Sequence, residues 1–451
     1  MSETSERIAA LAPLLDDWLR FQQWYREIPS LAVGISVGGE TVYAGVHGMA
    51  DVERGTTATV DTRYRIASHS KVFTATAVMA LFARGALRLD DAVSEHVPWF
   101  RSSKNTELES VTIRQLLSHS GGITRDGTTT HWFEDRFPDL DEIVAQVDEV
   151  VPVFGPVEKL KYSNIGFTLL GQVIESVTAQ PYETHVADTL LTPLGLSHTT
   201  PDLPDDMAEH ATGYTMRLPG RPRLPVAHIR AGVMNSATGF SSTVGDLLRW
   251  YQAHLVGSGD LFEDRHKREM QRVQFEGGGM RWGLGFQLAS HGGLDFSSHG
   301  GGYPGFITYS GVNQKHEMAI VVLTSTIDGP ARELFAGIAN LVKKSVDGDF
   351  EAEVGPDASG VAGFYENRWS IEQVAQVGSK LAVIAPTALD PAASLQMLDH
   401  IEGLRFRLPD NLPTGSPGEE VWFEPGDPPI LHAPAVPPTE RSLPWDFPGP
   451  R

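Results

Sequence analysis

Strand-like sequence lies at both ends of the first 345 residues, and a long, mostly helical stretch separates the two ends. The first two runs are rich in apolar and β-branched residues and flank Gly38-Gly39, which predicts a hairpin over 31–46. Further strands are predicted at 282–288, 294–299, 306–311 and 318–326. Because strands must pair to bury their apolar faces, this order predicts an α/β (α+β) fold. We expect an antiparallel sheet flanked by helices, with a mostly helical lobe inserted at about 88–240.

Helical periodicity flanks and interrupts these strands. Apolar residues recur at a spacing near 3.6 in four long segments outside the inserted lobe, which predicts amphipathic helices. These segments are 7–27, 71–86, 245–256 and 331–344. Shorter helices are predicted within the lobe, at 112–118, 139–148, 166–178 and 183–191.

The character of the sequence changes after Ser345. Residues 346–361 are rich in Asp, Gly and Pro and read as a linker. Short alternating runs follow, which predict a small all-β domain with the form of a barrel, and the Pro-rich stretch 433–451 is expected to be an extended arm. The predicted domains are therefore 1–345, the linker 346–361, and a C-terminal β domain over 362–451.

Charge and composition restrict the partners. The chain contains no Cys, so disulfides, thiol catalysis and thiolate metal sites are excluded, and we expect no metal and no cofactor. A net charge of −21 repels nucleic acid and anionic membranes. No basic and apolar leader opens the sequence, and no apolar run approaches the ~18 residues that span a bilayer. We expect a cytoplasmic protein, or a periplasmic or secreted one if a leader has been removed.

The first chemical motif is Ser68-His69-Ser70-Lys71 at the start of a predicted helix. Residues three apart on a helix lie on the same face, so Lys71 can reach Ser68. A serine hydroxyl needs a base within hydrogen-bonding distance, and a lysine serves if its pKa is lowered. Alone, the same pattern also fits an N-cap serine beside an exposed lysine.

Two further motifs follow in order, Tyr162-Ser163-Asn164 and His299-Gly300-Gly301-Gly302. Ser-x-x-Lys, Tyr-x-Asn and a strand bearing Lys/His-x-Gly together resemble the signature of the class C β-lactamase superfamily. Its relatives include penicillin-binding-protein-like peptidases, serine carboxylesterases and D-aminopeptidases. The resemblance covers about residues 8–345, and the β-rich C-terminal part resembles the lipocalin-like appendage of some members.

The resemblance implies a role for each motif residue. Ser68 would be the nucleophile, Lys71 would take or relay its proton, and Tyr162 would assist as a phenolate or through a shared proton. Asn164 would hydrogen-bond Lys71 or a substrate amide, and His299 would donate a hydrogen bond and titrate near ~6.5. The oxyanion hole would use the N–H groups of Ser68 and Gly302. We expect substrate to lie against Asn164, Gly300, Gly301 and Gly302.

Similar patterns elsewhere receive no chemical role. Tyr365-Glu366-Asn367 follows the His-Gly-Gly element, and His291-Gly292-Gly293 reads as a hairpin turn. We interpret His119-Ser120-Gly121 as a structural turn. His69 is expected to face away from Ser68.

The function predicted is a serine hydrolase, an esterase or peptidase that cleaves a small ester or amide through an acyl-enzyme on Ser68. His299 stands where lactamases carry a lysine, which argues against a dedicated β-lactamase. Three alternatives stay open: β-lactamase-like activity, acyl transfer, and a catalytically silent binding protein. The expected partner is a small-molecule ester, amide or short peptide, without nucleic acid or membrane, and homo-oligomerisation is left open.

Overall fold

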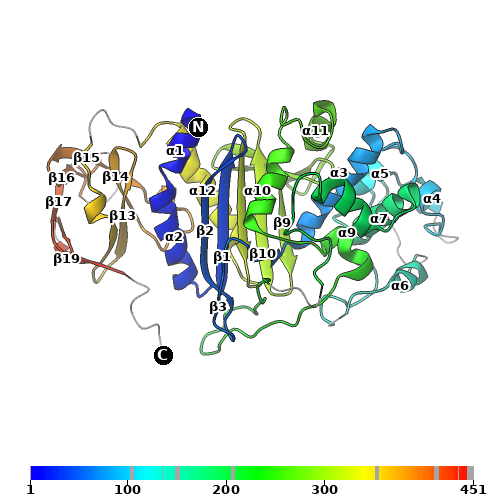
Figure 1. Ribbon diagram of the computed structural model, residues 1–451, viewed down its shortest axis with the longest axis horizontal. Helices are drawn as coiled ribbons and strands as arrows, with labels where there is room; N and C mark the ends of the chain where they lie inside the picture. The colour runs from blue at the N-terminus through cyan, green and yellow to red at the C-terminus, as the bar shows by residue number, and fades with distance from the viewer. Residues whose placement is uncertain are drawn as a thin grey trace. The chain divides into compact units, whose positions relative to one another are not determined.

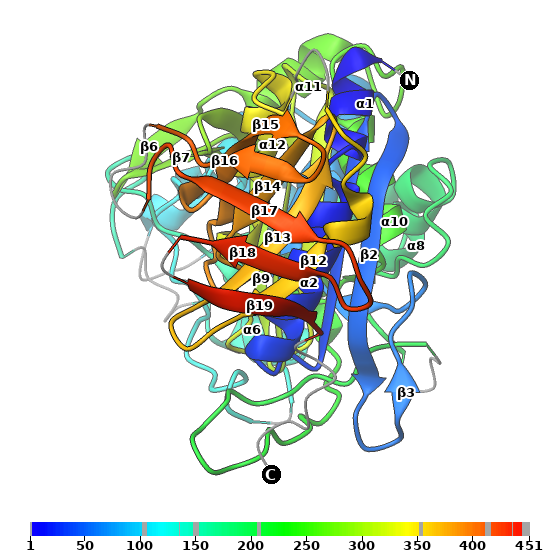
Figure 2. The same cartoon turned by 90° about the vertical axis from the view of Figure 1, so that its left-hand side faces the viewer.

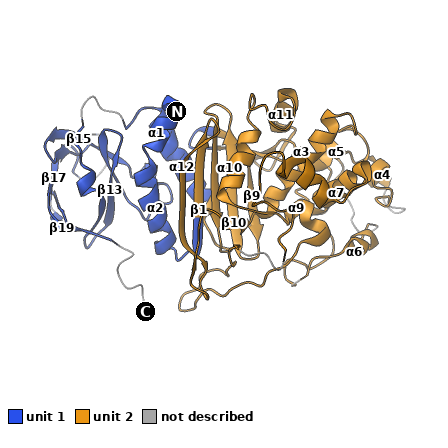
Figure 3. Cartoon of the chain, viewed as in Figure 1, with its two compact units in different colours: residues 1–31, 291–294, 332–451 blue, residues 32–290, 295–331 orange. Residues whose placement is uncertain are grey.

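The computed structural model describes residues 2–101, 106–134, 136–147, 153–204, 209–350, 355–410, 416–434 and 436–443. The chain divides into two compact units, coloured separately in Figure 3. The larger unit comprises Ala32–Ser290 and Asp295–Ala331, and the smaller comprises Met1–Leu31, His291–Leu294 and Arg332–Arg451.

The larger unit is built on a nine-stranded sheet with the order β3-β2-β1-β11-β10-β9-β8-β7-β6. Its strands are β1 (Ser30–Val37), β2 (Glu40–Asp51), β3 (Thr56–Thr57), β6 (Phe275–Gly277), β7 (Met280–Trp282), β8 (Gln287–His291), β9 (Leu294–Tyr303), β10 (Phe306–Asn313) and β11 (Met318–Thr324). The hairpin from the start of the chain, labelled β1 and β2 in Figure 1, joins the later strands because β1 pairs with β11. Every residue of β1 and β11 is buried, as in the centre of a sheet. The antiparallel sheet predicted from the order of elements is confirmed.

One predicted strand, 282–288, is divided into β7 and β8. Gly285 has a φ of +79° in the connecting turn, and the N–H of Gly283 bonds the carbonyl of Phe286. A positive φ of this kind favours glycine, so the two glycines turn the chain where the apolar pattern alone suggested continuity. His291-Gly292-Gly293 forms the β8–β9 turn, as predicted.

Helices make up the rest of the larger unit. They are η1 (Ala67–His69), α3 (Ser70–Ala83), α4 (Val93–His96), η2 (Thr106–Ser110), α5 (Ile113–Leu117), α6 (Leu140–Ala145), α7 (Asn164–Thr178), α8 (Tyr182–Val186), η3 (Ala187–Leu191), η4 (Gly232–Met234), α9 (Asn235–Thr238), α10 (Val244–Ala253) and α11 (Asp264–Gln271). A two-stranded sheet pairs β4 (Tyr64–Arg65), which precedes η1, with β5 (Ser241–Ser242), which lies between α9 and α10 in the chain. Nearly every residue of α3 is buried, and Phe73 stacks on Trp250 with ring centroids 3.8 Å apart. The helix that follows Ser68 is therefore held on all sides.

The smaller unit contains a closed barrel, shown in Figure 2. Its strands are β12 (Gly363–Glu366), β13 (Ile371–Val377), β14 (Lys380–Ile384), β15 (Gln396–Glu402), β16 (Arg405–Arg407), β17 (Glu420–Glu424), β18 (Ile430–Ala433) and β19 (Val436–Ser442). Its helices are α1 (Glu3–Ala9), α2 (Ala12–Tyr25), α12 (Ala331–Val346), η5 (Ser359–Val361) and η6 (Pro391–Ala393). The predicted barrel is confirmed.

Two expectations for the smaller unit were wrong. The helix predicted over 7–27 is two helices, because Pro13 begins a new helix in the first turn of α2. The Pro-rich segment is a strand rather than an arm over Val436–Ser442, since β19 pairs with both β18 and β12 and closes the barrel. Residues 444–451 lie outside the described residues.

Candidate active site

Ser68 lies in the single turn of η1 that leads into α3. Ala67, immediately before it, has a φ of +49°, a conformation that non-glycine residues seldom adopt. The hydroxyl of Ser70 donates to the carbonyl of Ala67 at 2.5 Å and ties this turn to the helix. The strained turn leaves Ser68 partly exposed while the residues on both sides are buried, which suits a nucleophile.

Lys71 is fully buried, and its ammonium nitrogen is surrounded by neutral oxygen atoms. Nζ lies 3.2 Å from Ser68 Oγ, 2.7 Å from Asn164 Oδ1 and 2.7 Å from the carbonyl of Ala237. Burial lowers the pKa of Lys71 well below its usual value, and the charge of Asp126 opposes this only in part. Because the amine loses its proton readily, it can accept the proton of Ser68.

Tyr162 lies just before α7, with its ring centroid 4.8 Å from Lys71 Nζ. Burial raises the pKa of its hydroxyl, although the hydrogen bond with Ser68 lowers it somewhat. The expectation that Lys71 favours a phenolate is therefore wrong for the resting site. Desolvation disfavours the charged form of both groups, which favours a neutral amine beside a neutral phenol.

His299 lies on β9 and is buried. Its Nδ1 is 2.6 Å from the carbonyl of Gly300, which can only accept, so Nδ1 carries the hydrogen and Nε2 is an acceptor. Burial, with the nearby charge of Lys71, lowers the pKa of His299 to about 3. The expected donor with a charge near pH ~6.5 is therefore corrected to a neutral acceptor.

Four aromatic rings form one side of the site: Tyr162, His119, Trp282 and His299. The ring of His119 lies 4.4 Å from that of Tyr162 and 4.6 Å from that of Trp282, and Trp282 lies 5.5 Å from His299. Nδ1 of His119 accepts a hydrogen bond from the N–H of Ser163 at 3.2 Å. His119 does occupy a turn, with a φ of +56°, but it also holds the segment that carries Tyr162. The sequence interpretation missed this second role.

Two further residues were missed, Arg125 and Asp126. Asp126 accepts a hydrogen bond from Asn164 Nδ2 at 2.6 Å, which orients the amide so that its oxygen faces Lys71. The guanidinium of Arg125 lies 5.7 Å from the Tyr162 ring and 3.2 Å from Asp126. Nothing in the sequence pattern singled out these two side chains.

The three glycines of β9 differ in their surroundings. A Cβ on Gly301 would lie 2.3 Å from the carbonyl of Ile66 and 2.4 Å from Thr308 Oγ1, so β9 passes very close to the turn that carries Ser68. Gly302 is exposed, and a Cβ there would contact only Ile307, at 3.5 Å. Gly300 lies against Tyr309. The strand therefore approaches the nucleophile at Gly301 and has open space beside Gly302.

The second Tyr-x-Asn and the second His-Gly-Gly sequence lie away from Ser68. Tyr365 begins its motif on barrel strand β12, and His291 is at the β8–β9 turn. His69 is buried against Tyr251, with Nδ1 3.0 Å from its hydroxyl. In the described part of the chain, no group of three or more His, Cys, Asp or Glu could hold a metal ion. Within the same residues, no helix has both the length and the apolar character needed to cross a membrane.

A turn that exposes Ser68, a buried lysine and a glycine-rich strand on this sheet match the arrangement expected of a serine-hydrolase type of site. The family described as Beta-lactamase matches residues 15–342, and the chain therefore belongs to this family. "Protein flp" of Staphylococcus aureus (strain MW2) is 34% identical over 191 residues, which cover 42% of this chain and 38% of that protein. The chain thus aligns with less than half the length of this curated relative.

Two solved structures share the fold. A class C β-lactamase matches with a TM-score of 0.64 and 22% identity, covering 74% of this chain and 96% of its own. An octameric penicillin-binding protein homologue from Pyrococcus abyssi matches with a TM-score of 0.65 and 22% identity, covering 95% of this chain and 99% of its own. The second match extends beyond the family segment and over most of the chain.

Proposed function

We propose that this protein is a serine hydrolase that cleaves a small ester or amide through an acyl-enzyme on Ser68. The observation that carries the proposal is the environment of Lys71. It is a fully buried amine, 3.2 Å from Ser68 Oγ, with a lowered pKa. A lysine kept only for structure would be expected to pair with a carboxylate at this depth.

The proposed reaction begins with a neutral Lys71. Ser68 Oγ attacks the carbonyl carbon of the substrate while its proton passes to Lys71 Nζ, and the charge on the carbonyl oxygen is stabilised by the N–H groups of Ser68 and Gly302. The C–O or C–N bond to the leaving group then breaks. The leaving group takes a proton from Lys71 through the Tyr162 hydroxyl, which bonds Ser68. Water hydrolyses the acyl-enzyme by the same steps in reverse order.

The charges of the site favour neutral substrates. With a pKa of about 3, His299 offers no cation for a substrate carboxylate at neutral pH. Arg125 is 62% exposed, and its charge is balanced by Asp126 at 3.2 Å. These features support an ester or amide without a required carboxylate more than a dedicated β-lactam substrate.

The test is a set of initial rates on one substrate panel. It contains p-nitrophenyl esters of increasing length, D- and L-aminoacyl p-nitroanilides, and a chromogenic cephalosporin. Ser68→Ala should lower the rate on the preferred substrate by at least about a thousandfold. Ser258→Ala is a matched control, because Ser258 also contacts a buried lysine, with Lys267 Nζ 2.5 Å from its Oγ. Full activity of Ser68→Ala would contradict the proposal.

A further inference from the structure

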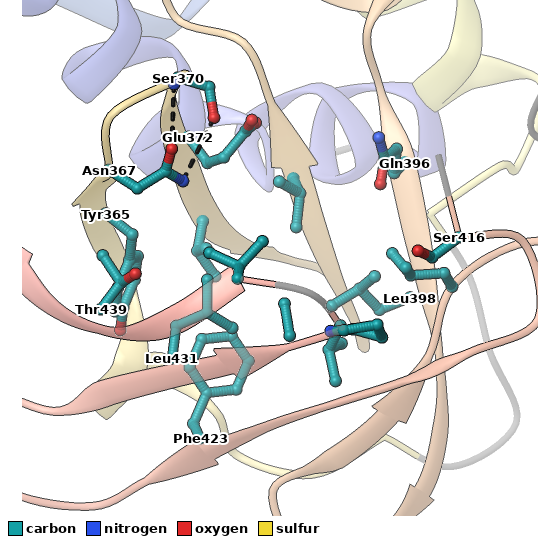
Figure 4. A pocket seen from close by; sticks show the side chains of 17 residues that line it. Tyr365, Asn367, Ser370, Glu372, Gln396, Leu398, Ser416, Phe423, Leu431 and Thr439 are labelled. Atoms are coloured by element: carbon teal, nitrogen blue, oxygen red, sulfur yellow. Dashed lines mark hydrogen bonds between the residues drawn. The ribbon is translucent and has the colours of Figure 1, made fainter. Parts of the chain in front are cut away.

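The interior of the barrel contains a cavity of about 220 Å³. All the residues that line it belong to the segment from Tyr365 to Thr439. Apolar side chains such as Val374, Leu398 and Phe423 form most of its wall (Figure 4). For comparison, an apolar cavity of about 150 Å³ in a protein is large enough to bind benzene.

One carboxylate stands on this apolar wall. Successive side chains of a strand point to opposite faces, and on β13 the buried Gln373 reaches outward, where it donates to the carbonyl of Leu14 in α2 at 2.9 Å. Glu372 and Val374 therefore both point into the barrel, and both line the cavity. Figure 4 shows the Glu372 carboxyl group directed into the space between Asn367 and Gln396.

No cation pairs with Glu372 among the residues the structure describes. Burial raises the pKa of this carboxyl group, and a hydrogen bond from Ser370 lowers it only in part. Glu372 is half-buried, and a carboxylate that has lost part of its hydration is stabilised by a partner of opposite charge. On the wall of a cavity this size, a bound ligand can be that partner.

Four polar residues of the cavity lie at one end of the barrel. Asn367 and Ser370 belong to the β12–β13 turn, Gln396 begins β15, and Ser416 lies in the β16–β17 connection. In an up-and-down barrel these connections share one end. Trp369 in the first of these turns is 97% exposed. The cavity therefore has a polar end, where Glu372 lies, and an apolar interior.

We propose that the barrel binds one small amphipathic amine, with its ammonium group on Glu372 and its apolar body among Val374, Leu398 and Phe423. The ammonium would stabilise the carboxylate, and the apolar wall would take up a short alkyl chain. A carboxylate ligand would be repelled by Glu372, and a neutral alcohol would leave it unpaired. The protein's net charge of −21 also attracts cations. This site is independent of the chemistry at Ser68.

The test is calorimetric titration of the full chain at pH 7 with n-octylamine, 1-octanol, octanoate and ethylamine. We expect saturable one-to-one binding of octylamine, at least about tenfold tighter than octanol, and no binding of octanoate or ethylamine. Octanol or octanoate binding as tightly as octylamine would overturn the proposal, and so would the absence of saturable octylamine binding.

Two variants locate the site. Glu372→Gln keeps the shape of the side chain and should weaken octylamine binding at least about tenfold while octanol binding is unchanged. The retained octanol binding shows that the cavity is still formed. Glu424→Gln, at an exposed position on β17, is the matched control and should bind octylamine like the wild type. Equal octylamine binding by Glu372→Gln and the wild type would contradict the assignment.

Discussion

At the scale of single residues, the protonation state of Lys71 governs the chemistry of the site. Its nitrogen has Ser68, Asn164 and a backbone carbonyl as partners, and all three are neutral. Lys267 is equally buried, but Asp264 lies 3.9 Å from its nitrogen. These two buried lysines therefore separate the effect of a base from the effect of a buried, hydrogen-bonded side chain.

Replacement of Lys71 by Met keeps the apolar stem and removes the amine. We expect kcat/KM to fall by about 10²–10⁴, because Ser68 loses its proton acceptor. Lys267→Met is the control, and it should lower the melting temperature without a comparable change in kcat/KM. Equal losses of activity in the two variants would indicate a structural role for both lysines.

The pH dependence of kcat/KM follows from the protonation of Lys71 and His299. Only neutral Lys71 can accept the Ser68 proton, so kcat/KM should rise as pH increases through the lowered pKa of Lys71 and then level off. His299, with a pKa of about 3, is neutral throughout and should add no inflection between about pH 5 and 8. The profile of the wild type should be compared with that of His299→Gln. An inflection near pH ~6.5 that disappears in the variant would contradict the neutral state of His299.

Asp126 is expected to act as a positioning residue through Asn164. Without its carboxylate the Asn164 amide can rotate away from Lys71, so Asp126→Ala should lower kcat about tenfold with little change in KM. Asp126→Asn should restore most of the rate, since an amide oxygen can still accept from Asn164 Nδ2. Failure of this rescue, with a normal melting temperature, would argue against the positioning role.

At the scale of elements, β9 brings the glycines to the nucleophile turn. Gly301→Ala places a Cβ against the Ile66 carbonyl and Thr308 Oγ1, and either β9 or the turn must move. We expect kcat/KM to fall by about a hundredfold, as for a misplaced oxyanion donor. Gly302→Ala meets only Ile307 at 3.5 Å and keeps its N–H, so it should retain activity within a fewfold. Steady-state kinetics on the two variants provides the comparison, and equal loss in both would contradict the close approach at Gly301.

Most of the secondary-structure elements could be predicted from the sequence. Periodicity and turn residues placed the sheet strands, α3 and the barrel, because these patterns report local burial. The spacing of Ser68 and Lys71 predicted their contact, since it depends on one helical turn. Asp126 and the contact of His119 with the Tyr162 segment were not predicted, because they depend on loop residues distant in the sequence. The neutral states of Tyr162 and His299 depend on burial, which the motifs do not report.

At the scale of the whole molecule, buried neutral histidines should make folding sensitive to acid. His254 is fully buried between Thr76 and the carbonyl of Trp250, and burial lowers its pKa to about 4. In the unfolded chain His254 binds a proton below about pH 6.5, whereas in the folded chain His254 binds one only below about pH 4. The free energy of unfolding should therefore decrease as pH falls through this window, by about 1.4 kcal/mol per pH unit for each such histidine.

Urea unfolding at several pH values between about 4 and 7 measures this dependence. His254→Gln should show a shallower loss of stability than the wild type, because its side chain takes up no proton on unfolding. His400→Gln, at an exposed position on β15, is the control and should keep the wild-type slope. Identical slopes in all three proteins would contradict the assignment of acid sensitivity to buried histidines.

The domain boundaries at 345 and 361 remain a proposal at this scale. Expression of residues 362–451 alone would test whether the barrel segment folds without the rest of the smaller unit. Because α2 supplies contacts to β13 and the Trp18 indole donates to the carbonyl of Ala388, we expect the isolated segment to be less stable than the barrel in the full chain.

The central claim is that Ser68 forms a covalent acyl-enzyme. Its most direct test is intact-mass analysis of the protein quenched during turnover of its preferred p-nitrophenyl ester, followed by peptide mapping. We expect one acyl group per chain, located on Ser68, absent from Ser68→Ala and still present in Ser258→Ala. An acyl group on another residue, or undiminished turnover by Ser68→Ala, would contradict the claim.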